Sequence, residues 1–272
     1  MTHPRPAGTV RCALHVHSTY SDGEFTLAEL RELFLKAGVR VVCMADHDYY
    51  FTPERVADYV GECTQLSDDR LQFIPGLEFE CTDRMHVLGY GVTTLAGDPD
   101  PERVFGHIEE EGGVSVIAHP KDAHFPWIEG FTVLPMGVEV WNSKYDGRYA
   151  PRARTFDLYR RLRARRPEMR AFYGQDLHWR TQFRALYTDV RASSPAREAV
   201  LRALAAGEFE GVHGEMVLPS DGALDAGTLA RFDALNARSN RIWRALKAVK
   251  GMTGWLGRHL PAPVKAQLRR LF

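Results

Sequence analysis

The sequence predicts an α/β fold built on a parallel sheet or barrel, and three observations support this prediction. Short apolar runs alternate with segments of helical periodicity along most of the chain. The length of 272 residues is one at which α/β barrels fold as a single large domain. Histidine and acidic side chains gather just after several apolar runs, and parallel α/β folds build their functional sites at the ends of their strands.

Each predicted element rests on a local pattern. Residues 26–37 place leucine and phenylalanine side chains at helical spacing, and Gly38 is a natural stop after them. Thr52 is the expected N-cap of the next helix, and Pro53 suits the first helical position because an N–H there would be unpaired. In chain order, we expect strands at residues 9–14, 39–45, 71–80, 85–91, 114–118, 138–141 and 169–174, and helices at residues 26–37, 53–66, 101–111 and 153–165.

Composition narrows the class of protein. The sequence has no run of 18 apolar residues, and its first residues lack the pattern of a signal peptide, so we expect a cytoplasmic protein. The four cysteines show no C-x-x-C pairing, and Cys12 and Cys43 fall in predicted strands. Reduced thiols in the core are therefore expected, rather than disulfides or zinc thiolates.

Charge divides the chain into two parts. No acidic residue follows Asp233, whereas nine lysine and arginine residues do. We therefore predict a domain at residues 1–233 and a basic C-terminal extension at residues 234–272. From Ile242 the apolar residues of the extension recur at spacings of three and four, so they would share one helix face opposite the basic side chains.

Two interpretations of this extension stay open. It could pack on the domain as a terminal helix with a solvated basic face. It could instead bind an anionic membrane surface or an acidic partner, which Trp243 and Trp255 favour, and the protein would then be peripheral to the membrane. Nucleic acid is the least favoured partner. Gly251, Gly254 and Gly257 would weaken the helix in isolation, so binding could be what orders it.

The candidate functional residues begin at the end of the first predicted strand. Alternate residues of a strand point to the same side, so His15 and His17 would present two imidazoles next to a loop that carries Asp22. Asp46 and His47 are adjacent and would face opposite ways, so we assign His47 to a metal and Asp46 to orienting an imidazole. Six of the eleven histidines are predicted just beyond an apolar run: His15, His17, His47, His86, His119 and His178.

Taken in order, the segments HVHSTYSDG, ADHD, PGLEFE, HVLGY, AHP and QDLH resemble the motifs of the PHP (polymerase and histidinol phosphatase) domain family. The resemblance covers roughly residues 10–178 and implies a distorted TIM-like (β/α)7 barrel with up to three metal ions at the C-terminal ends of its strands. Carried over by position, it implies a first metal on His15, His17 and Asp176, a second on His86 and His119 with Glu78 bridging the two, and a third on Asp22, His47 and His178.

The chemistry of these residue types agrees with the resemblance. Two metal ions about 3.5–4 Å apart can hold the attacking and leaving oxygens of a phosphoryl displacement. A carboxylate such as that of Glu78 has two oxygens and can bridge them, whereas an imidazole cannot. We expect two to three divalent ions (zinc, manganese or iron) and a metal-bridged hydroxide as the nucleophile. The expected catalytic residues are Glu78, Asp176 and His178.

These observations favour a metal-dependent phosphoesterase that hydrolyses a small phosphomonoester. Two alternatives stay open: metal-dependent hydrolysis of a non-phosphate substrate, as in amidohydrolases, and a metal-stabilised binding or scaffold module tethered by the extension. The presence of every expected ligand argues against the scaffold. Four cationic residues follow strand ends and are candidates for binding the substrate phosphate: Lys121, Lys144, Arg148 and Arg180.

Overall fold

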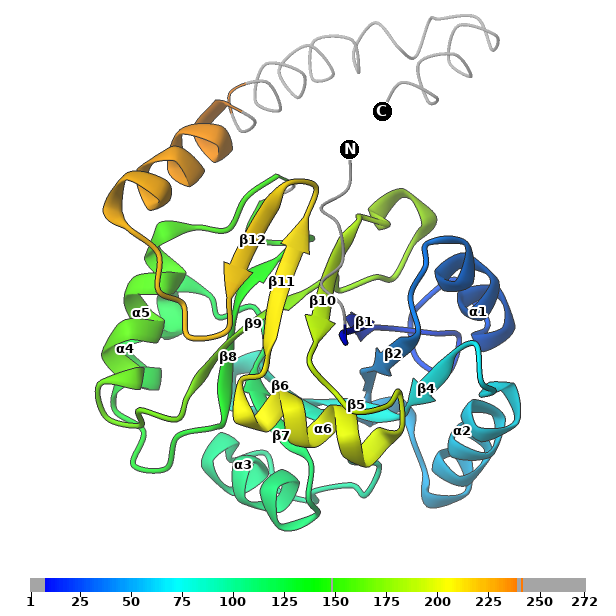
Figure 1. The fold of residues 1–272 in the computed structure, drawn as a ribbon. Coiled ribbons are helices and arrows are strands. Elements are labelled where there is room, and N and C mark those ends of the chain that lie inside the picture. The colour runs from blue at the N-terminus through cyan, green and yellow to red at the C-terminus, as the bar shows by residue number, and fades with distance from the viewer. Residues whose placement is uncertain (1–7, 148, 239–240, 242–272) are drawn as a thin grey trace, which may run out of the picture.

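The computed structural model describes residues 8–147, 149–238 and 241. Its strands are β1 (Val10–Val16), β2 (Val41–Met44), β3 (Asp46–His47), β4 (Gln72–Ile74), β5 (Gly76–Cys81), β6 (Met85–Tyr90), β7 (Val114–Ile117), β8 (Gly137–Asn142), β9 (Arg170–Gly174), β10 (Leu186–Val190), β11 (Phe209–His213) and β12 (Met216–Pro219). They form two six-stranded sheets in the orders β12-β11-β10-β1-β2-β4 and β3-β5-β6-β7-β8-β9 (Figure 1).

Two single residues carry the chain from the first sheet into the second. Ala45 separates β2 from β3, and its N–H donates to the carbonyl of Val16 in β1 (2.9 Å). Pro75 separates β4 from β5, and proline has no N–H with which to continue the hydrogen-bond ladder. The strand predicted at residues 71–80 is therefore a bent strand that belongs to both sheets, and the one predicted at residues 39–45 continues through β3 into the second sheet.

The sheets meet again where the chain leaves β9. The N–H of Leu177 donates to the carbonyl of His15 (3.2 Å), and the N–H of His17 donates to the carbonyl of Leu177 (3.1 Å). Val16 and Leu177 thus form a parallel bridge between the two sheets. β10, β11 and β12 extend the first sheet beside β1 as antiparallel strands. The other strands, with each bent strand counted once, are seven and surround the core, which confirms the predicted distorted TIM-like barrel.

One strand of the barrel runs against the expected parallel order. β6 pairs antiparallel with both β5 and β7. Only Thr82–Arg84 connect β5 to β6, whereas a parallel connection needs a dozen or more residues. Asp83 and Arg84 both have positive φ angles, 58° and 55°, which produce the tight reversal. The start of β6 consequently lies at the same end of the barrel as the end of β5.

The helices lie around the outside of the sheets (Figure 1). They are α1 (Leu27–Lys36), α2 (Pro53–Leu66), α3 (Pro101–Glu110), α4 (Phe125–Glu129), α5 (Ala153–Arg163) and α6 (Arg197–Ala206). The four helices predicted from the sequence are confirmed to within two residues at each end. Thr26 and Glu29 form a capping box at the start of α1, and the side chain of Thr52 accepts the N–H of Arg55 at the start of α2.

The end of the described chain packs on the barrel. Residues 226–238 are helical, and within them Leu229 and Phe232 are buried in the core. The side-chain amide of Asn236 donates to the carbonyls of Ala150 (3.2 Å) and Pro151 (2.9 Å). The boundary predicted at residue 233 therefore falls inside a helix. The amphipathic segment predicted from Ile242 lies outside the described residues.

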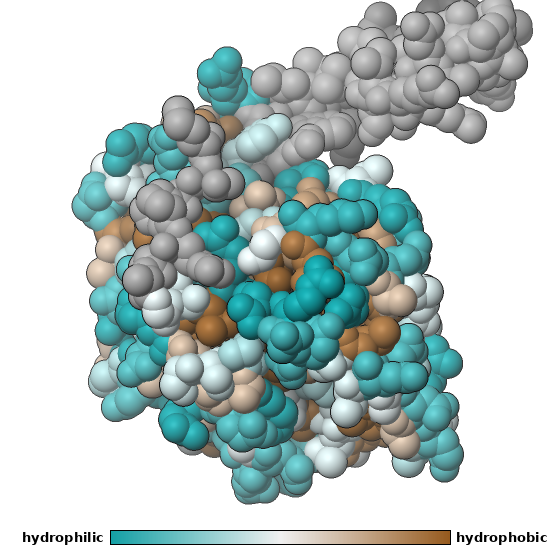
Figure 2. Space-filling view, turned by 45° about the vertical axis from the view of Figure 1, so that its right-hand side comes forward, coloured by the Kyte–Doolittle hydropathy of each residue, from teal (hydrophilic) through white to brown (hydrophobic). Residues whose placement is uncertain are grey.

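The surface is largely polar and the core is apolar. In Figure 2, hydrophilic residues cover most of the face in view, and hydrophobic ones appear in small patches between them. Among the described residues, no helix is long and apolar enough to span a membrane. The four cysteines are buried free thiols, as expected: Cys12, Cys43, Cys63 and Cys81.

Candidate metal centre

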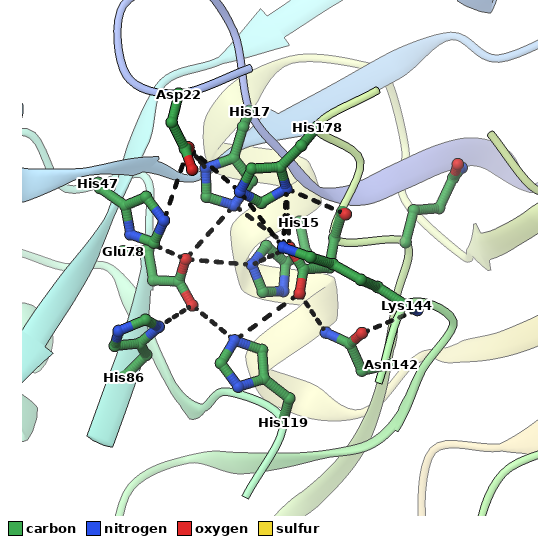
Figure 3. Close-up of polar contacts among 12 residues, drawn as sticks. His15, His17, Asp22, His47, Glu78, His86, His119, Asn142, Lys144 and His178 are labelled. Atoms are coloured by element: carbon green, nitrogen blue, oxygen red, sulfur yellow. Dashed lines mark hydrogen bonds and ion pairs between the residues drawn. The ribbon is translucent and has the colours of Figure 1, made fainter. Parts of the chain in front are cut away.

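All nine side chains predicted as metal ligands lie together at one end of the barrel, and Figure 3 shows eight of them by label. Their nitrogen and oxygen atoms form four overlapping groups, and within each group the atoms lie within 4.8 Å of one another. The four groups are His17, Asp22, His47 and His178; His15, His119 and Asp176; His15, His17 and Glu78; and His47, Glu78 and His86.

The first two histidines reach the centre from β1. Their ring centroids lie 5.2 Å apart, side by side as predicted. His15 has a φ angle of 61° and sits where the register with β2 shifts between Leu14 and Val16. A bulge therefore turns His15 toward the centre, and the alternation of a regular strand does not account for its direction.

Glu78, near the middle of β5, is the hub of the centre (Figure 3). Its Oε1 lies 3.0 Å from His86 Nδ1 and 3.0 Å from His119 Nε2. Its Oε2 lies 3.2 Å from His47 Nδ1, 3.3 Å from His17 Nε2 and 3.4 Å from His15 Nε2. Each oxygen thus faces its own set of imidazoles, which is the arrangement that a bridging carboxylate requires.

A second cluster of side chains, around Asp22 and His178, lies beside the one around Glu78. Asp22 Oδ1 lies 3.1 Å from His178 Nε2 and 3.7 Å from His47 Nε2. The other ring nitrogen of His178, Nδ1, lies 3.0 Å from Asp176 Oδ1. The His17 and His178 rings stack with centroids 3.9 Å apart, so this group is continuous with the one around Glu78.

The unpaired atoms of the centre fit divalent cations. Five buried atoms lack a hydrogen-bond partner within the described structure: His15 Nε2, His17 Nδ1 and Nε2, His47 Nδ1 and Glu78 Oε2. Leaving buried polar atoms without partners is costly, and native structures rarely gather several at one point. Imidazole nitrogen and carboxylate oxygen suit zinc, manganese and iron, so cations would satisfy these atoms.

The protonation states of His17, Glu78 and Asp176 suit metal binding as well. Burial lowers the pKa of His17 to about 3, so its ring is neutral at pH 7. Burial by itself raises the pKa of Glu78, but the charges of His15 and His86 reverse this and hold it well below its usual range. The pKa of Asp176 is also held well below its usual range, because the charge of His15 and the hydrogen bond to His178 outweigh burial. Both carboxylates are therefore anions.

Sequence reasoning missed two residues that support the centre, Glu139 and Asn142 of β8. Glu139 Oε1 lies 2.8 Å from His15 Nδ1, and its Oε2 accepts the backbone N–H of His119 (2.9 Å). The amide of Asn142 donates to Glu139 Oε2 (2.9 Å) and to Asp176 Oδ2 (3.0 Å). A charged residue inside the apolar run at 138–141 was the available signal.

The same pair connects the strained residues of the centre. His15, His119 and Asp176 all have positive φ angles, which residues other than glycine seldom adopt. Each of the three has a hydrogen bond to Glu139 or Asn142. The pair therefore holds in place one of the four candidate metal groups, at a cost in backbone strain.

The predicted role of Asp46 is wrong. Its two oxygens accept hydrogen bonds from the N–H and hydroxyl of Ser18 (2.8 and 2.9 Å) and from the N–H and hydroxyl of Ser21 (3.1 and 2.6 Å). Asp46 therefore orders the loop that carries Asp22 and does not orient an imidazole. Glu139 makes the imidazole contact that was expected of it.

His86 also departs from the sequence argument, which placed it beyond the end of an apolar run. It is the second residue of β6 and lies near the start of that strand. It still joins the centre because β6 is antiparallel to β5, and Glu80 in β5 is its register partner. The reversal of one strand therefore supplies a ligand that the parallel pattern alone would put at the far end.

The residues predicted to bind the substrate phosphate lie in different surroundings, and only one of them contacts the centre. Lys144 Nζ lies 3.1 Å from Asp176 Oδ1 and 3.2 Å from His178 Nδ1, so it belongs to the centre (Figure 3). Lys121 Nζ donates to the carbonyl of Arg84 (3.5 Å). Arg180 is exposed and pairs with Glu29 (2.6 Å), so its charge is directed to α1 and not to the centre. Arg148 lies outside the described residues.

Comparison with known proteins gives a family match for part of the chain. Residues 13–131 match the model of the PHP domain, a segment that holds seven of the nine predicted ligands. Asp176 and His178 lie beyond it, and the fold brings them in. The DNA polymerase/3′-5′ exonuclease PolX of Bacillus subtilis is 30% identical over 81 residues. That alignment covers 27% of this chain and only 14% of PolX.

Solved structures share the fold at low sequence identity. A two-domain protein of Bacteroides vulgatus containing a predicted PHP-like metal-dependent phosphoesterase superposes with a TM-score of 0.53 at 15% identity, over 84% of this chain and 70% of that one. PsfC of Pseudomonas syringae superposes with a TM-score of 0.52 at 16% identity, over 88% and 99% of the two chains. Residues 13–131 of this chain therefore match the PHP domain family, and the solved structures share the fold of the barrel.

Proposed function

We propose that this chain is a metal-dependent phosphoesterase that hydrolyses a small phosphomonoester. The observation that carries the proposal is the position of Glu78, whose two oxygens face separate sets of imidazoles. Its own Oε2 and four buried imidazole nitrogens beside it have no hydrogen-bond partner among the described residues. Two cations sharing one carboxylate is the arrangement that phosphoryl displacement uses.

The nine predicted ligands would hold two to three cations, with Glu78 shared between two of them. Zinc, manganese or iron bound there would activate water and neutralise the charge of the phosphate. Among the chain's own groups, Lys144 Nζ places a positive charge at the edge of the centre, where it can donate to a phosphate oxygen. Asp22 and Asp176 contact opposite nitrogens of His178 and so fix the orientation of that ring.

The test is phosphate release by the purified chain after its metal has been removed with a chelator and restored with manganese or zinc. Adenosine 5′-monophosphate and ribose 5-phosphate are suitable substrates because both are simple phosphomonoesters. Activity should be absent without metal and return with it. Glu110 is an exposed carboxylate on α3. The Glu110→Gln variant is the matched control for replacing Glu78 with glutamine, and it should behave as the wild type.

Two results would overturn the proposal. Stoichiometric metal with no phosphate release from any phosphomonoester would favour a metal-stabilised binding module. Metal-dependent cleavage of amides with no action on phosphomonoesters would favour the amidohydrolase-like alternative.

A further inference from the structure

The last helix of the described chain, which we call the terminal helix (residues 226–238), runs toward the end of the barrel that holds the metal centre. Just before it, the carbonyl of Leu224 accepts a hydrogen bond from the Arg160 side chain on α5 (2.7 Å). Further along, Asp233 Oδ1 accepts the N–H of Ala153, the first residue of α5 (3.2 Å). Because α5 follows β8, that residue lies at the end of the barrel toward which β8 points, which is the metal-centre end. The chain after the terminal helix therefore leaves the domain beside the centre.

Every exposed aromatic side chain among the described residues lies at this same end of the barrel. Two follow β3, two lie between β8 and α5, and one follows β9. The ring centroids of Tyr49 and His47 are 5.0 Å apart, and those of Trp179 and His178 are 5.6 Å apart, so the aromatic side chains reach the edge of the centre. We call this set the aromatic face: Tyr49, Tyr50, Tyr145, Tyr149 and Trp179. Single exposed aromatic residues are common, but several gathered on one face mark an interaction surface.

The charge of the basic extension indicates what this surface meets. After Asp233 the chain has nine lysine and arginine residues and no acidic residue, and apolar residues that include Trp243 and Trp255 alternate with them. This composition is typical of segments that lie on a bilayer. Anionic headgroups attract lysine and arginine, and tyrosine and tryptophan are enriched at the level of the headgroups. A flat anionic surface can therefore meet the basic extension and the aromatic face at once, because both lie at one end of the barrel.

We propose that the metal-centre end of the barrel docks on an anionic bilayer, with the aromatic face in the headgroup layer and the charge of the basic extension holding it there. The centre then opens toward the membrane, and the opposite end of the barrel faces the solvent. This orientation holds whether or not the centre hydrolyses phosphomonoesters, so it can fail or succeed independently of the proposed function.

A fluorescent thiol probe can report the orientation. The four native cysteines are buried, which leaves an introduced surface cysteine as the reactive thiol. Tyr50→Cys places the probe on the aromatic face, where Tyr50 is 43% exposed. Val133→Cys places it at the opposite end of the barrel, where Val133 is 49% exposed and precedes the start of β8. Both full-length, manganese-loaded proteins are mixed at low salt with vesicles of equal parts phosphatidylglycerol and phosphatidylcholine.

Both proteins should sediment with these vesicles, but only one probe should respond. The emission of a nitrobenzoxadiazole probe should rise and shift to the blue in Tyr50→Cys, because the probe enters a less polar layer, and should stay unchanged in Val133→Cys. Spin-labelled lipid should quench the first probe alone. High salt, or vesicles of phosphatidylcholine only, should abolish the response because the attraction between charges is screened or absent.

Substitutions measure the contribution of the aromatic face itself. Tyr50→Ala combined with Tyr149→Ala should weaken vesicle binding about tenfold, which is about 1.4 kcal/mol. The same two positions changed to tryptophan should keep the binding, because tryptophan also prefers the headgroup level. Val133→Ala is the matched control and should bind as the wild type. Equal manganese content and equal unfolding midpoints would verify that each variant is folded.

Each contrary result would overturn the proposal in a distinct way. A response at Val133 as large as that at Tyr50 would mean that another face docks. Sedimentation with both probes silent would mean that the basic extension tethers the domain without orienting it. Wild-type binding by the double alanine variant would remove the aromatic face from the contact. No sedimentation with anionic vesicles would exclude the bilayer and favour an acidic protein as the partner of the basic extension.

Discussion

At the scale of single residues, Glu78 determines how the centre is arranged. It is buried, its two oxygens contact five imidazoles from four separate segments, and its Oε2 lacks a hydrogen-bond partner within the described structure. A buried carboxylate among histidines is stable only if cations or protonated rings balance its charge. We attribute that balance to divalent ions.

Replacing Glu78 with glutamine should therefore affect metal and activity together. Glutamine keeps the size of the side chain but has one oxygen and no charge, so it cannot bridge two cations. We expect at least one equivalent of metal to be lost and activity to fall well beyond tenfold, where each tenfold step is about 1.4 kcal/mol of barrier. Elemental analysis and steady-state kinetics measure the two effects. A variant with over about a tenth of the wild-type rate would contradict the bridging role.

Asn142 tests the support behind the ligands. Asn142→Ala removes the hydrogen bonds to Glu139 and Asp176 and should weaken metal affinity by about 10–100-fold, the usual effect of losing a partner that orients a ligand. Asn236→Ala is the matched control because Asn236 is also buried and bonded, but to carbonyls away from the centre. A metal titration of both variants compares them.

If Asn142→Ala and Asn236→Ala change metal affinity equally, the effect is one of general stability and the positioning role is wrong. An unchanged affinity in Asn142→Ala would lead to the same conclusion.

At the scale of the element, the sequence predicts the helices and strands whose ends are set by neighbouring residues. The predicted cap at Thr52 sets the start of α2, which begins at Pro53 as predicted. The cap of α1 is Thr26, so this helix begins one residue after its predicted start. The breaks at Ala45 and Pro75 depend instead on how two sheets share a strand, and the antiparallel β6 depends on a three-residue turn. No periodicity reveals such tertiary features, so the sequence could not predict them.

Two glycines give a matched test of the bent strand. A Cβ at Gly76 would lie 2.6 Å from the carbonyl oxygen of Gly89 and 2.7 Å from that of Met44, both backbone atoms that cannot move aside. Gly61 lies within α2 with open space around it. Gly76→Ala should destabilise the fold by about 1–3 kcal/mol, as overpacking does.

Gly61→Ala should instead stabilise the fold by about 0.5–1 kcal/mol, because alanine is the better helix former. Unfolding in denaturant, with equal slopes for both variants, measures the difference. Stability changes of the same sign would show that the junction between β4 and β5 is looser than described.

At the scale of the whole molecule, the sequence predicts the candidate metal ligands but not the residues that hold them in place. Most of the nine predicted ligands come together because the ends of strands meet at one face of a barrel, which is a property of the fold class. His86 joins them from the start of the antiparallel strand β6. Glu139 and Asn142 act through contacts between β8, β1 and the chain after β9, and Arg180 pairs with Glu29 of α1 instead of the centre. Such pairings depend on positions in space that spacing along the chain does not encode.

The basic extension remains a proposal about the whole chain. Each basic residue near an anionic bilayer contributes about 1 kcal/mol, and the attraction fades within a Debye length. The full chain should therefore sediment with anionic liposomes at low salt and be released at high salt, whereas a chain ending at residue 241 should stay in solution. This end point keeps the packed helix at 226–238.

The shortened chain should keep its metal and its activity. Both properties would show that it is folded, so a loss of liposome binding could not be due to unfolding. If it precipitates or loses metal, the extension is part of the packing of the barrel, and the membrane proposal fails.

The most direct test of the account is a crystal structure of the manganese-loaded chain with anomalous scattering measured at the manganese edge. We predict two or three anomalous peaks among the nine ligands, two of them within coordination distance of different oxygens of Glu78. Fewer than two peaks, or peaks that Glu78 does not contact, would contradict the claim that a carboxylate-bridged metal centre carries the function of this protein.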